Sequence, residues 1–213
     1  MKPKVDYSLY LVTDRAILKG RALLQAVEEA IQGGVTVVQL REKKISSRDF
    51  YTRALHLKEV TRKYRIPLII NDRLDIMLAV DADGLHVGED DLPLITARRI
   101  LGPDKILGYS AGNVTEALRG QEEGADYLGS GPVYPTGSKA DAGEPIGPAG
   151  LQAIKESVKI PVVAIGGIDL ARIPQVRETG VDGIAVISAI LGQPEPKEAS
   201  RVLREAWNGK ANL

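Results

Sequence analysis

Short apolar runs alternate regularly with longer amphipathic stretches along the chain, and this alternation constrains the fold most. The runs are rich in Val, Ile and Leu, and the stretches between them are about ten to fifteen residues long, which is typical of repeated strand–helix units. Strands that are this uniformly apolar are buried on both faces, which predicts a closed parallel (β/α)8 barrel, a TIM barrel. The eight runs are Ser8–Thr13, Val35–Leu40, Pro67–Asn71, Gly84–Val87, Lys105–Ser110, Tyr127–Ser130, Pro161–Ile165 and Gly183–Ile187.

The length of 213 residues suits one sizeable core, so we expect residues 1–213 to form a single barrel domain. An open doubly wound sheet is the alternative, but no G-x-G-x-x-G motif follows the first run. Ser46 offers an N-cap for the amphipathic stretch that ends near Tyr64. Gly and Asp recur just before several runs, as in Gly124-Ala125-Asp126, and Gly there suits the left-handed residue that ends a helix.

Composition excludes several classes of protein. Lys and Arg number 28, as do Asp and Glu, and a net charge of zero argues against nucleic acid or an anionic membrane as partner. The absence of cysteine excludes disulfides, thiolate nucleophiles and cysteine-bound metals. The N-terminus does not resemble a signal peptide, and the apolar runs are too short to cross a bilayer. We therefore expect a soluble cytoplasmic protein.

Polar residues gather where the predicted strands end. Active sites of such barrels form at the C-terminal ends of the strands, so these residues are expected to meet around one mouth. The connection from Ser130 to Pro148 is the one long loop, and long loops inside compact domains are usually functional. The polar segments are Gln39-Leu40-Arg41-Glu42-Lys43, Asn71-Asp72-Arg73, His86 to Asp91, Ser110, Gly131 to Lys139, Gly166-Gly167 and Ile187-Ser188.

Two aspartates at neighbouring strand ends, Asp72 and Asp91, form a candidate metal site. Two facing carboxylates favour a hard divalent cation, and Mg²⁺ commonly takes one or two carboxylates together with phosphate oxygens of a substrate. For either residue alone, helix capping or an ion pair with Arg73 is an equally reasonable interpretation.

Two candidate phosphate sites flank this position. Arg41, Lys43 and Lys139 place three positive charges around the mouth, and the signal lies in their clustering. Gly166-Gly167 and Ser188 follow the last two strands, where such barrels usually bind phosphate, although a tight turn explains the glycines equally well. The loop from Thr136 to Lys139 could reach between the two sites, or form a plain polar turn.

The histidines and serines do not suggest covalent catalysis. His56 falls in a predicted helix and His86 in the fourth strand, where a hydrogen-bonded core histidine is the favoured interpretation. Ser110 and Ser188 have no histidine base in their motifs, so we expect neither to be a nucleophile.

Seven of these motifs, in order from about Leu9 to Ala189, resemble the thiamine phosphate synthase family. They are Gln39-Leu40-Arg41-Glu42-Lys43, Asn71-Asp72, His86-Val87-Gly88 with Asp91, Ser110, Gly131 to Lys139, Ile165-Gly166-Gly167 and Ile187-Ser188. The resemblance implies a magnesium-dependent transferase of thiamine biosynthesis on a TIM barrel. Such an enzyme joins 4-amino-2-methyl-5-(diphosphooxymethyl)pyrimidine to 4-methyl-5-(2-phosphoethyl)thiazole or its 2-carboxy form, and yields thiamine phosphate and pyrophosphate.

The resemblance also implies residue roles. Asp72 and Asp91 would ligate Mg²⁺, and Arg41, Lys43, Ser110 and Lys139 would be catalytic, in a dissociative transfer that passes through a carbocation-like state. The pyrimidine diphosphate site would comprise Gln39, Leu40, Arg41, Glu42, Lys43, Asn71, Ser110 and Lys139. The thiazole phosphate site would comprise Thr136, Gly137, Ser138, Gly167, Ile187 and Ser188. The implied partners are these small molecules, without nucleic acid or membrane, and a homo-oligomer is compatible with them.

Two positions depart from the family pattern: Glu89 stands where Gln is common, and Ser138 where Thr is common. Three alternative functions stay open. A thiazole tautomerase on the same barrel binds only the thiazole phosphate and does not need the diphosphate set. A phosphosugar isomerase or Schiff-base aldolase needs a desolvated lysine at a strand end. A non-catalytic phosphate-binding barrel would bind both ligands without turnover.

Overall fold

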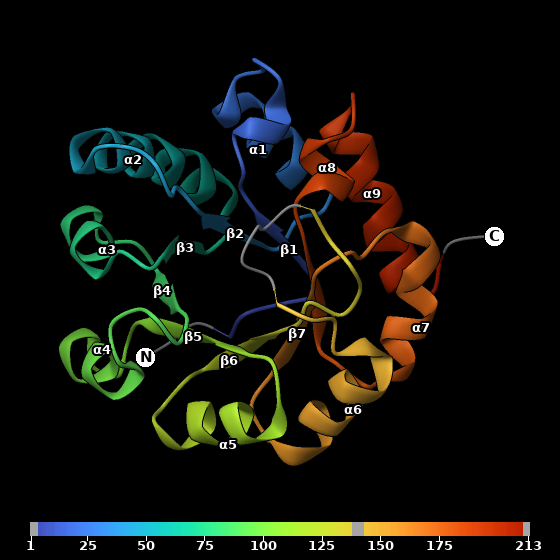
Figure 1. Ribbon diagram of the computed structural model, residues 1–213. Helices are drawn as coiled ribbons and strands as arrows, with labels where there is room; N and C mark the ends of the chain where they lie inside the picture. The colour runs from blue at the N-terminus through green and yellow to red at the C-terminus, as the bar shows by residue number, and fades with distance from the viewer. Residues whose placement is uncertain (1–3, 138–142, 211–213) are drawn as a thin grey trace.

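The computed structural model describes residues 4–137 and 143–210 and has eight parallel strands closed into a barrel, with helices around it (Figure 1). The strands pair in chain order, and the last pairs with the first. They are β1 (Leu9–Val12), β2 (Val37–Leu40), β3 (Leu68–Asn71), β4 (Gly84–Val87), β5 (Ile106–Ala111), β6 (Tyr127–Ser130), β7 (Val162–Ile165) and β8 (Gly183–Val186). The predicted TIM barrel is confirmed.

Helices follow the strands in the order that the sequence predicts. The eight predicted runs coincide with the strands to within two residues at either end. Ser46 caps its helix, since its side chain accepts a hydrogen bond from the Asp49 amide at 3.1 Å. The helices are α1 (Leu23–Gln32), α2 (Ser47–Tyr64), α3 (Leu74–Val80), α4 (Leu94–Leu101), α5 (Val114–Glu122), α6 (Gly147–Ser157), α7 (Ile173–Glu178), α8 (Ser188–Leu191) and α9 (Pro196–Trp207), with short 3-10 turns η1 (Ala16–Leu18) and η2 (Leu170–Arg172). Within the described ranges, none of these helices has the length and apolar character needed to cross a membrane.

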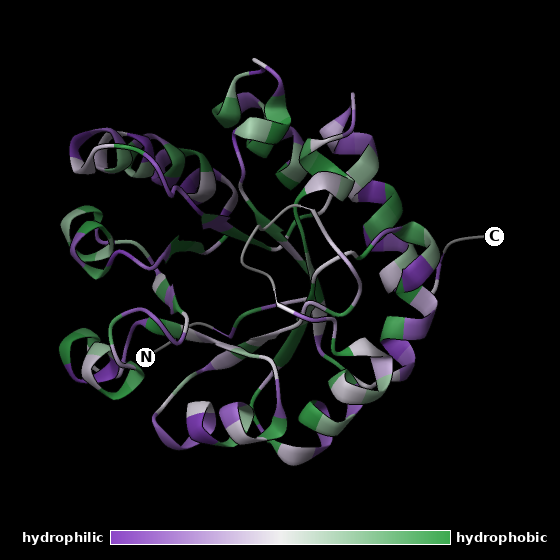
Figure 2. Cartoon of the chain, viewed as in Figure 1, coloured by the Kyte–Doolittle hydropathy of each residue, from purple (hydrophilic) through white to green (hydrophobic). Residues whose placement is uncertain are grey.

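Apolar side chains pack in two layers, one inside the barrel and one between the barrel and the helices. Along β1, Tyr10 and Val12 belong to the inner layer, whereas Leu9 and Leu11 belong to the outer one. This alternation is the period of two that a strand imposes on its side chains. Figure 2 shows the strands coloured mostly as hydrophobic, whereas the helices carry both hydrophobic and hydrophilic residues. The helices therefore cover the outside of the barrel.

At the N-terminal end of the barrel, the strands are tied together in pairs by the same two hydrogen bonds. The residue just before each even-numbered strand donates its amide to a carbonyl near the start of the preceding odd-numbered strand, at 2.7 to 3.0 Å. The odd-strand residue that supplies this carbonyl also donates its own amide to the side chain of the residue before the even-numbered strand, at 2.8 to 3.2 Å. We call this arrangement the strand-pair contact. The four contacts join Thr36 to Leu9, Asp83 to Leu68, Asp126 to Leu107 and Asp182 to Val162.

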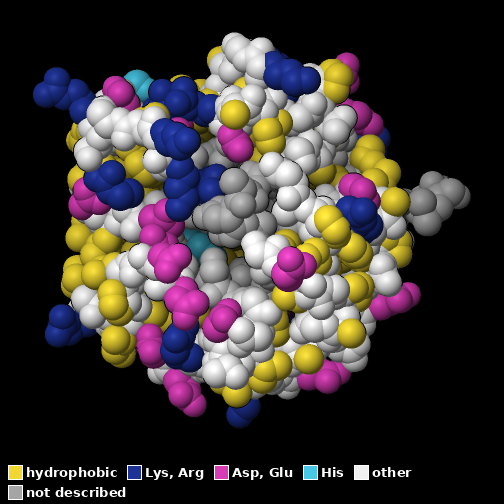
Figure 3. Space-filling view, viewed as in Figure 1, with side chains coloured by type: hydrophobic (Ala, Val, Ile, Leu, Met, Phe, Trp, Pro, Cys, Tyr) yellow, Lys and Arg dark blue, Asp and Glu magenta, His cyan; other side chains and the backbone are white. Residues whose placement is uncertain are grey.

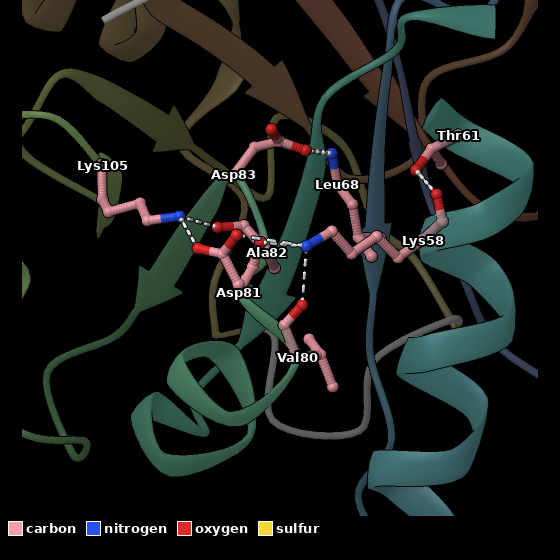
Figure 4. Close-up of polar contacts among 8 residues, drawn as sticks. All are labelled: Lys58, Thr61, Leu68, Val80, Asp81, Ala82, Asp83 and Lys105. Atoms are coloured by element: carbon pink, nitrogen blue, oxygen red, sulfur yellow. Dashed lines mark hydrogen bonds and ion pairs between the residues drawn. The ribbon is translucent and has the colours of Figure 1, made fainter. Parts of the chain in front are cut away.

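Basic side chains surround three of these contacts. Arg98 bonds Asp126, and Lys155 bonds Asp182, each at 2.6 Å. Beside the Asp83 contact, Lys58 donates to the carbonyls of Val80 and Asp81, and Lys105 bonds the Asp81 carboxylate at 2.5 Å (Figure 4). The left-handed glycines that the sequence predicts are present, for example Gly124 at φ 93°. The role of the neighbouring aspartates was not predicted.

Candidate active site

A cavity of about 470 Å³ opens at the C-terminal end of the barrel, and all eight strands contribute to its lining. Tyr10, Tyr127 and Val163 lie in its deeper part, within the inner apolar layer. Side chains of Lys, Arg, Asp and Glu stand next to one another along one edge of this face (Figure 3). The polar strand ends therefore surround one enclosed space, as predicted.

The two predicted metal ligands lie close together, although neither is among the residues that line the cavity. Asp72 follows β3 in a left-handed conformation, with φ 62°, and Asp91 accepts a hydrogen bond from the Gly88 amide at 2.8 Å. Burial and the neighbouring Asp72 carboxylate raise the pKa of Asp91. Neither alternative interpretation holds, because Asp72 bonds Lys43 at 2.6 Å and Arg73 instead pairs with Asp75. The described residues contain no group of three or more His, Cys, Asp or Glu arranged to hold a metal.

The segment after β2 sends alternate side chains in opposite directions. Gln39 and Arg41 line the cavity, and Arg41 makes no side-chain hydrogen bond or ion pair with any residue in the described ranges. Leu40 is fully buried against the helices, and Glu42 bonds Arg15 and Arg53. Both were predicted to bind the pyrimidine diphosphate, and neither is among the residues that line the cavity. Leu40 faces the helices because successive residues of a strand point to opposite faces.

The opposite wall of the cavity is formed largely by backbone. Gly166 and Gly167 have φ of 96° and 65°, and a Cβ atom at Gly167 would lie 2.7 Å from the Pro135 carbonyl oxygen. The glycines thus let the loop after β7 pack against the loop after β6, which adds a packing role to the phosphate-binding role predicted for them. The predicted Thr136, Gly137, Ile187 and Ser188 also line this wall, and Ser188 is the first residue of α8.

Two predicted residues, Ser138 and Lys139, lie outside the described residues. Several residues that line the cavity were missed by the sequence analysis, among them Arg172 and Asp169, which lie 3.8 Å apart as an ion pair. Arg172 stacks 4.6 Å above the ring of Tyr134 and donates to the Gly167 carbonyl. Its only sequence signal is a cation five residues after the Gly-Gly pair. It places a further positive charge on the wall that carries Thr136 and Ser188.

A buried hydrogen-bond network crosses the deep part of the cavity. The Gln39 amide donates to the Tyr10 hydroxyl at 2.9 Å, and this hydroxyl lies 2.8 Å from that of Tyr127. The Tyr127 hydroxyl lies 2.9 Å from Nδ1 of His86, whose Nε2 lies 3.0 Å from the Ser110 hydroxyl. The prediction that His86 is a hydrogen-bonded core histidine is confirmed. The motif around Ser110 contains no histidine, but pairing of β4 with β5 brings His86 beside it in space.

Comparison with known proteins identifies the family. Residues 9–190 match the family model described as thiamine monophosphate synthase. The chain is 56% identical over 203 residues to a thiamine-phosphate synthase of Desulfitobacterium hafniense strain Y51, which covers 95% of this chain and 98% of the relative. It is 56% identical over 199 residues to that of Clostridium novyi strain NT, covering 93% and 98%.

The structure agrees with the sequence comparison. The thiamine phosphate pyrophosphorylase structure from Pyrococcus furiosus superposes with a TM-score of 0.88 at 42% identity, covering 96% of each chain. The match spans the barrel and every strand end that lines the cavity. The chain belongs to the thiamine monophosphate synthase family.

Proposed function

We propose that this chain is a thiamine phosphate synthase, a transferase that joins 4-amino-2-methyl-5-(diphosphooxymethyl)pyrimidine to a thiazole phosphate and releases pyrophosphate. The observation that carries the proposal is the division of one cavity into two unlike walls. Arg41, Asn71 and Ser110 line one side, with Lys43 and the paired aspartates next to them in the chain or the fold, and the glycine backbone with Thr136 and Ser188 lines the other. Such a cavity suits two anionic ligands at once, which a tautomerase or a single-ligand barrel does not require.

The diphosphate is placed against Arg41 and Lys43. A guanidinium without a protein partner in the described ranges can form two parallel hydrogen bonds to phosphate oxygens. Lys43 already pairs with Asp72, so it can exchange that contact for a phosphate when substrate enters. Asn71 and Ser110 line the same side, where they face the pyrimidine ring in this proposal.

Asp72 and Asp91 suit a magnesium ion. Two adjacent carboxylates with a single described lysine between them carry excess negative charge, and the raised pKa of Asp91 reflects that crowding together with burial. An ion held there would supply positive charge to the departing diphosphate and would complete its coordination with phosphate oxygens and water. Asp72 and Asp91 are the two residues that would hold it.

The thiazole phosphate is placed against the backbone wall. Gly167, Thr136, Gly137, Ile187 and Ser188 surround a position after β7 and β8 where amides and hydroxyls can donate to phosphate. We include Ser138 in this set from its motif. This places the thiazole ring between its own phosphate and the pyrimidine methylene carbon.

The transfer is direct and dissociative in this proposal. The chain has no cysteine, and the thiazole nitrogen attacks the carbon from which diphosphate departs. Arg41, Lys43 and Lys139 stabilise the departing charge, and preorganised cations of this kind usually supply the largest catalytic contribution. The surrounding barrel excludes water, which would otherwise capture the pyrimidine cation.

The test is to incubate the purified protein with both substrates and Mg²⁺ and to measure thiamine phosphate and pyrophosphate. We expect both products in equal amounts, no product in excess chelator, and no product from Asp72→Asn. Isomerised thiazole phosphate without coupling would establish the tautomerase instead. Binding of both ligands without any product would establish the non-catalytic barrel.

A further inference from the structure

A buried hydrogen-bond network of Gln39, Tyr10, Tyr127, His86 and Ser110 joins Ser110, which faces the pyrimidine in the proposed function, to Gln39, which lines the same cavity. Its two ends, Gln39 and Ser110, line the cavity, and its middle members connect them across the barrel interior. Tyr10 and Tyr127 are 2% and 1% exposed, so water has little access to their hydroxyls. Burial raises the pKa of both tyrosines, which therefore remain phenols with one proton each.

Two glycines, Gly108 and Gly129, leave the space that this network occupies inside the barrel. A Cβ atom at Gly108 would lie 2.4 Å from His86 Nδ1 and 2.3 Å from Tyr127 Cζ. A Cβ atom at Gly129 would lie 3.1 Å from His86 Cε1. Glycine weakens the interior of a strand, so two inward glycines beside His86 indicate that its position is needed.

Counting protons gives the network one direction. The Gln39 amide donates to the Tyr10 hydroxyl, and the single proton of Tyr10 then has the Tyr127 oxygen as its acceptor. The proton of Tyr127 in turn has His86 Nδ1 as its acceptor. An unprotonated Nδ1 places the imidazole proton on Nε2, which donates to the Ser110 oxygen. With the Gln39 amide nitrogen toward Tyr10, the reverse order would leave the Tyr10 proton without an acceptor, which is costly.

We infer that Tyr10, Tyr127 and His86 are positioning residues that fix the Ser110 hydroxyl as a donor and the Gln39 amide oxygen as an acceptor toward the cavity, and so select an aminopyrimidine. The Ser110 oxygen is occupied by His86, which leaves its own proton for the ligand. The Gln39 amide oxygen has no donor among the described residues, and Gln39 lines the cavity. The inference rests on the proposed function for the identity of the ligand.

A 4-aminopyrimidine presents the matching groups: an amino donor beside a ring nitrogen acceptor. The 4-oxo counterpart presents an oxygen acceptor beside a protonated ring nitrogen, so it meets two mismatches at once. Mismatched buried polar groups are what lets a site reject a close analogue strongly. The same direction of protons prevents His86 from acting as a base for Ser110, because its Nε2 already carries a proton. The serine–histidine pair is thus a recognition element, and the transfer needs no serine nucleophile.

The first test measures the His86 tautomer in the ligand-free wild-type protein by nitrogen-15 NMR of labelled histidine. The chain has two histidines, and His56 lies exposed on α2, so a His56→Gln variant assigns both signals. We expect a neutral His86 with its proton on Nε2. A proton on Nδ1, or a doubly protonated ring, would overturn the inference.

The second test compares Tyr127→Phe with Tyr7→Phe. The Tyr7 ring lies 4.8 Å from that of Tyr127, but its hydroxyl is outside the network, so Tyr7→Phe is the matched control. Each protein is titrated with the diphosphates of the 4-amino and the 4-oxo pyrimidine, in Mg²⁺ and without thiazole phosphate. We expect wild type and Tyr7→Phe to prefer the amino compound by about a hundredfold, and Tyr127→Phe by less than about tenfold.

The reduced preference of Tyr127→Phe for the amino compound should come mainly from tighter binding of the oxo compound. Loss of the Tyr127 hydroxyl frees the Gln39 amide to turn over and the Ser110 hydroxyl to rotate, and a purely structural role would instead weaken both ligands equally. If Tyr127→Phe does not fold, Tyr10→Phe makes the same break at the adjacent hydroxyl. Unchanged discrimination in a folded variant, or no binding of the amino compound by wild type, contradicts the inference. Selective binding without formation of thiamine phosphate would leave the inference intact and defeat only the proposed function.

Discussion

At the N-terminal end of the barrel, Asp126 accepts hydrogen bonds from the Leu107 amide and from Arg98. At the C-terminal end, Arg41 has no side-chain partner in the described ranges, and Asp72 and Asp91 crowd together. Both ends carry carboxylates and cations next to strands. The N-terminal end uses its charges to bond the backbone, whereas the C-terminal end leaves charges available. We therefore propose that charged side chains at the N-terminal end contribute to stability, and that those at the C-terminal end contribute to ligand binding.

The comparison is sharpest for two arginines, one at each end. Arg41→Ala removes a cation that we place against the diphosphate, and we expect kcat/KM to fall on the order of a thousandfold, or about 4 kcal/mol of transition-state stabilisation. The free energy of unfolding should change by less than about 0.5 kcal/mol, because no described contact of the side chain is lost. Steady-state kinetics and urea unfolding of the same preparation check both halves. A large loss of stability would contradict the division between the two ends.

Arg98→Ala should do the opposite. Arg98 bonds Asp126 and also donates to the carbonyls of Gly124, Gly102 and Lys105, so its loss leaves several polar groups without a partner. We expect a loss of about 2–4 kcal/mol in the free energy of unfolding and little change in kcat for the folded enzyme. Urea unfolding followed by circular dichroism measures the first, and assays at a temperature where the variant stays folded measure the second.

A smaller loss of stability is expected at the strand-pair contact of Thr36, whose side-chain acceptor is an uncharged hydroxyl. Thr36 bonds the Leu9 amide at 3.2 Å, and Thr36→Val should cost about 1 kcal/mol of unfolding free energy. Thr52→Val is the matched control, since Thr52 is exposed on α2 and bonds only the Arg48 carbonyl of its own helix. Equal losses in the two variants would mean that the strand-pair contact adds nothing.

The smallest effect should appear in the pH dependence of stability. A hydrogen bond from Lys105 lowers the pKa of Asp81 below its ordinary value of 3.8. The resulting stabilisation is present above that value and is lost as the pH falls through the lower folded-state pKa. Because the Asp81 side chain is 76% exposed, we expect only a few tenths of a kcal/mol. Asp81→Asn should remove this part of the acid dependence, which urea unfolding at pH 7 and pH 3 would detect as a smaller difference than in wild type.

The sequence predicts the barrel well because buried strands consist almost entirely of apolar residues, which are visible in the sequence. The runs at Gly84–Val87 and Tyr127–Ser130 match their strands residue for residue, since both are bounded by turn residues. The side of the barrel that carries the site follows from chain direction alone. Family motifs add the segment after β2 as a whole, but cannot say which of its side chains turn inward. Glu42 therefore entered the predicted site although it bonds Arg15 and Arg53.

The buried hydrogen-bond network could not be predicted from the sequence. Tyr10 and Tyr127 are 117 residues apart, and each looks like an ordinary aromatic residue of an apolar strand. Their contact depends on the register around the closed barrel, which no local pattern encodes. The aspartates of the strand-pair contacts were visible as a recurring motif, but their side-chain acceptor role requires knowing which backbone amide lies opposite.

The strand-pair contacts also divide the barrel into quarters. Each strand-pair contact lies within a pair, β1–β2, β3–β4, β5–β6 or β7–β8. Between pairs the strands are joined by backbone ladders, as where the Leu128 amide donates to the Pro161 carbonyl, and by other side-chain contacts, such as that of Lys105 with Asp81. Pro67 and Pro161, just before β3 and β7, have no side-chain acceptor with which to repeat the contact. A break in the chain between quarters, for example near Gly102, leaves all four contacts within intact fragments. Complementary fragments cut there should reassemble more readily than fragments cut inside a quarter, so the molecule is suited to exchange of whole quarters with other eight-stranded barrels.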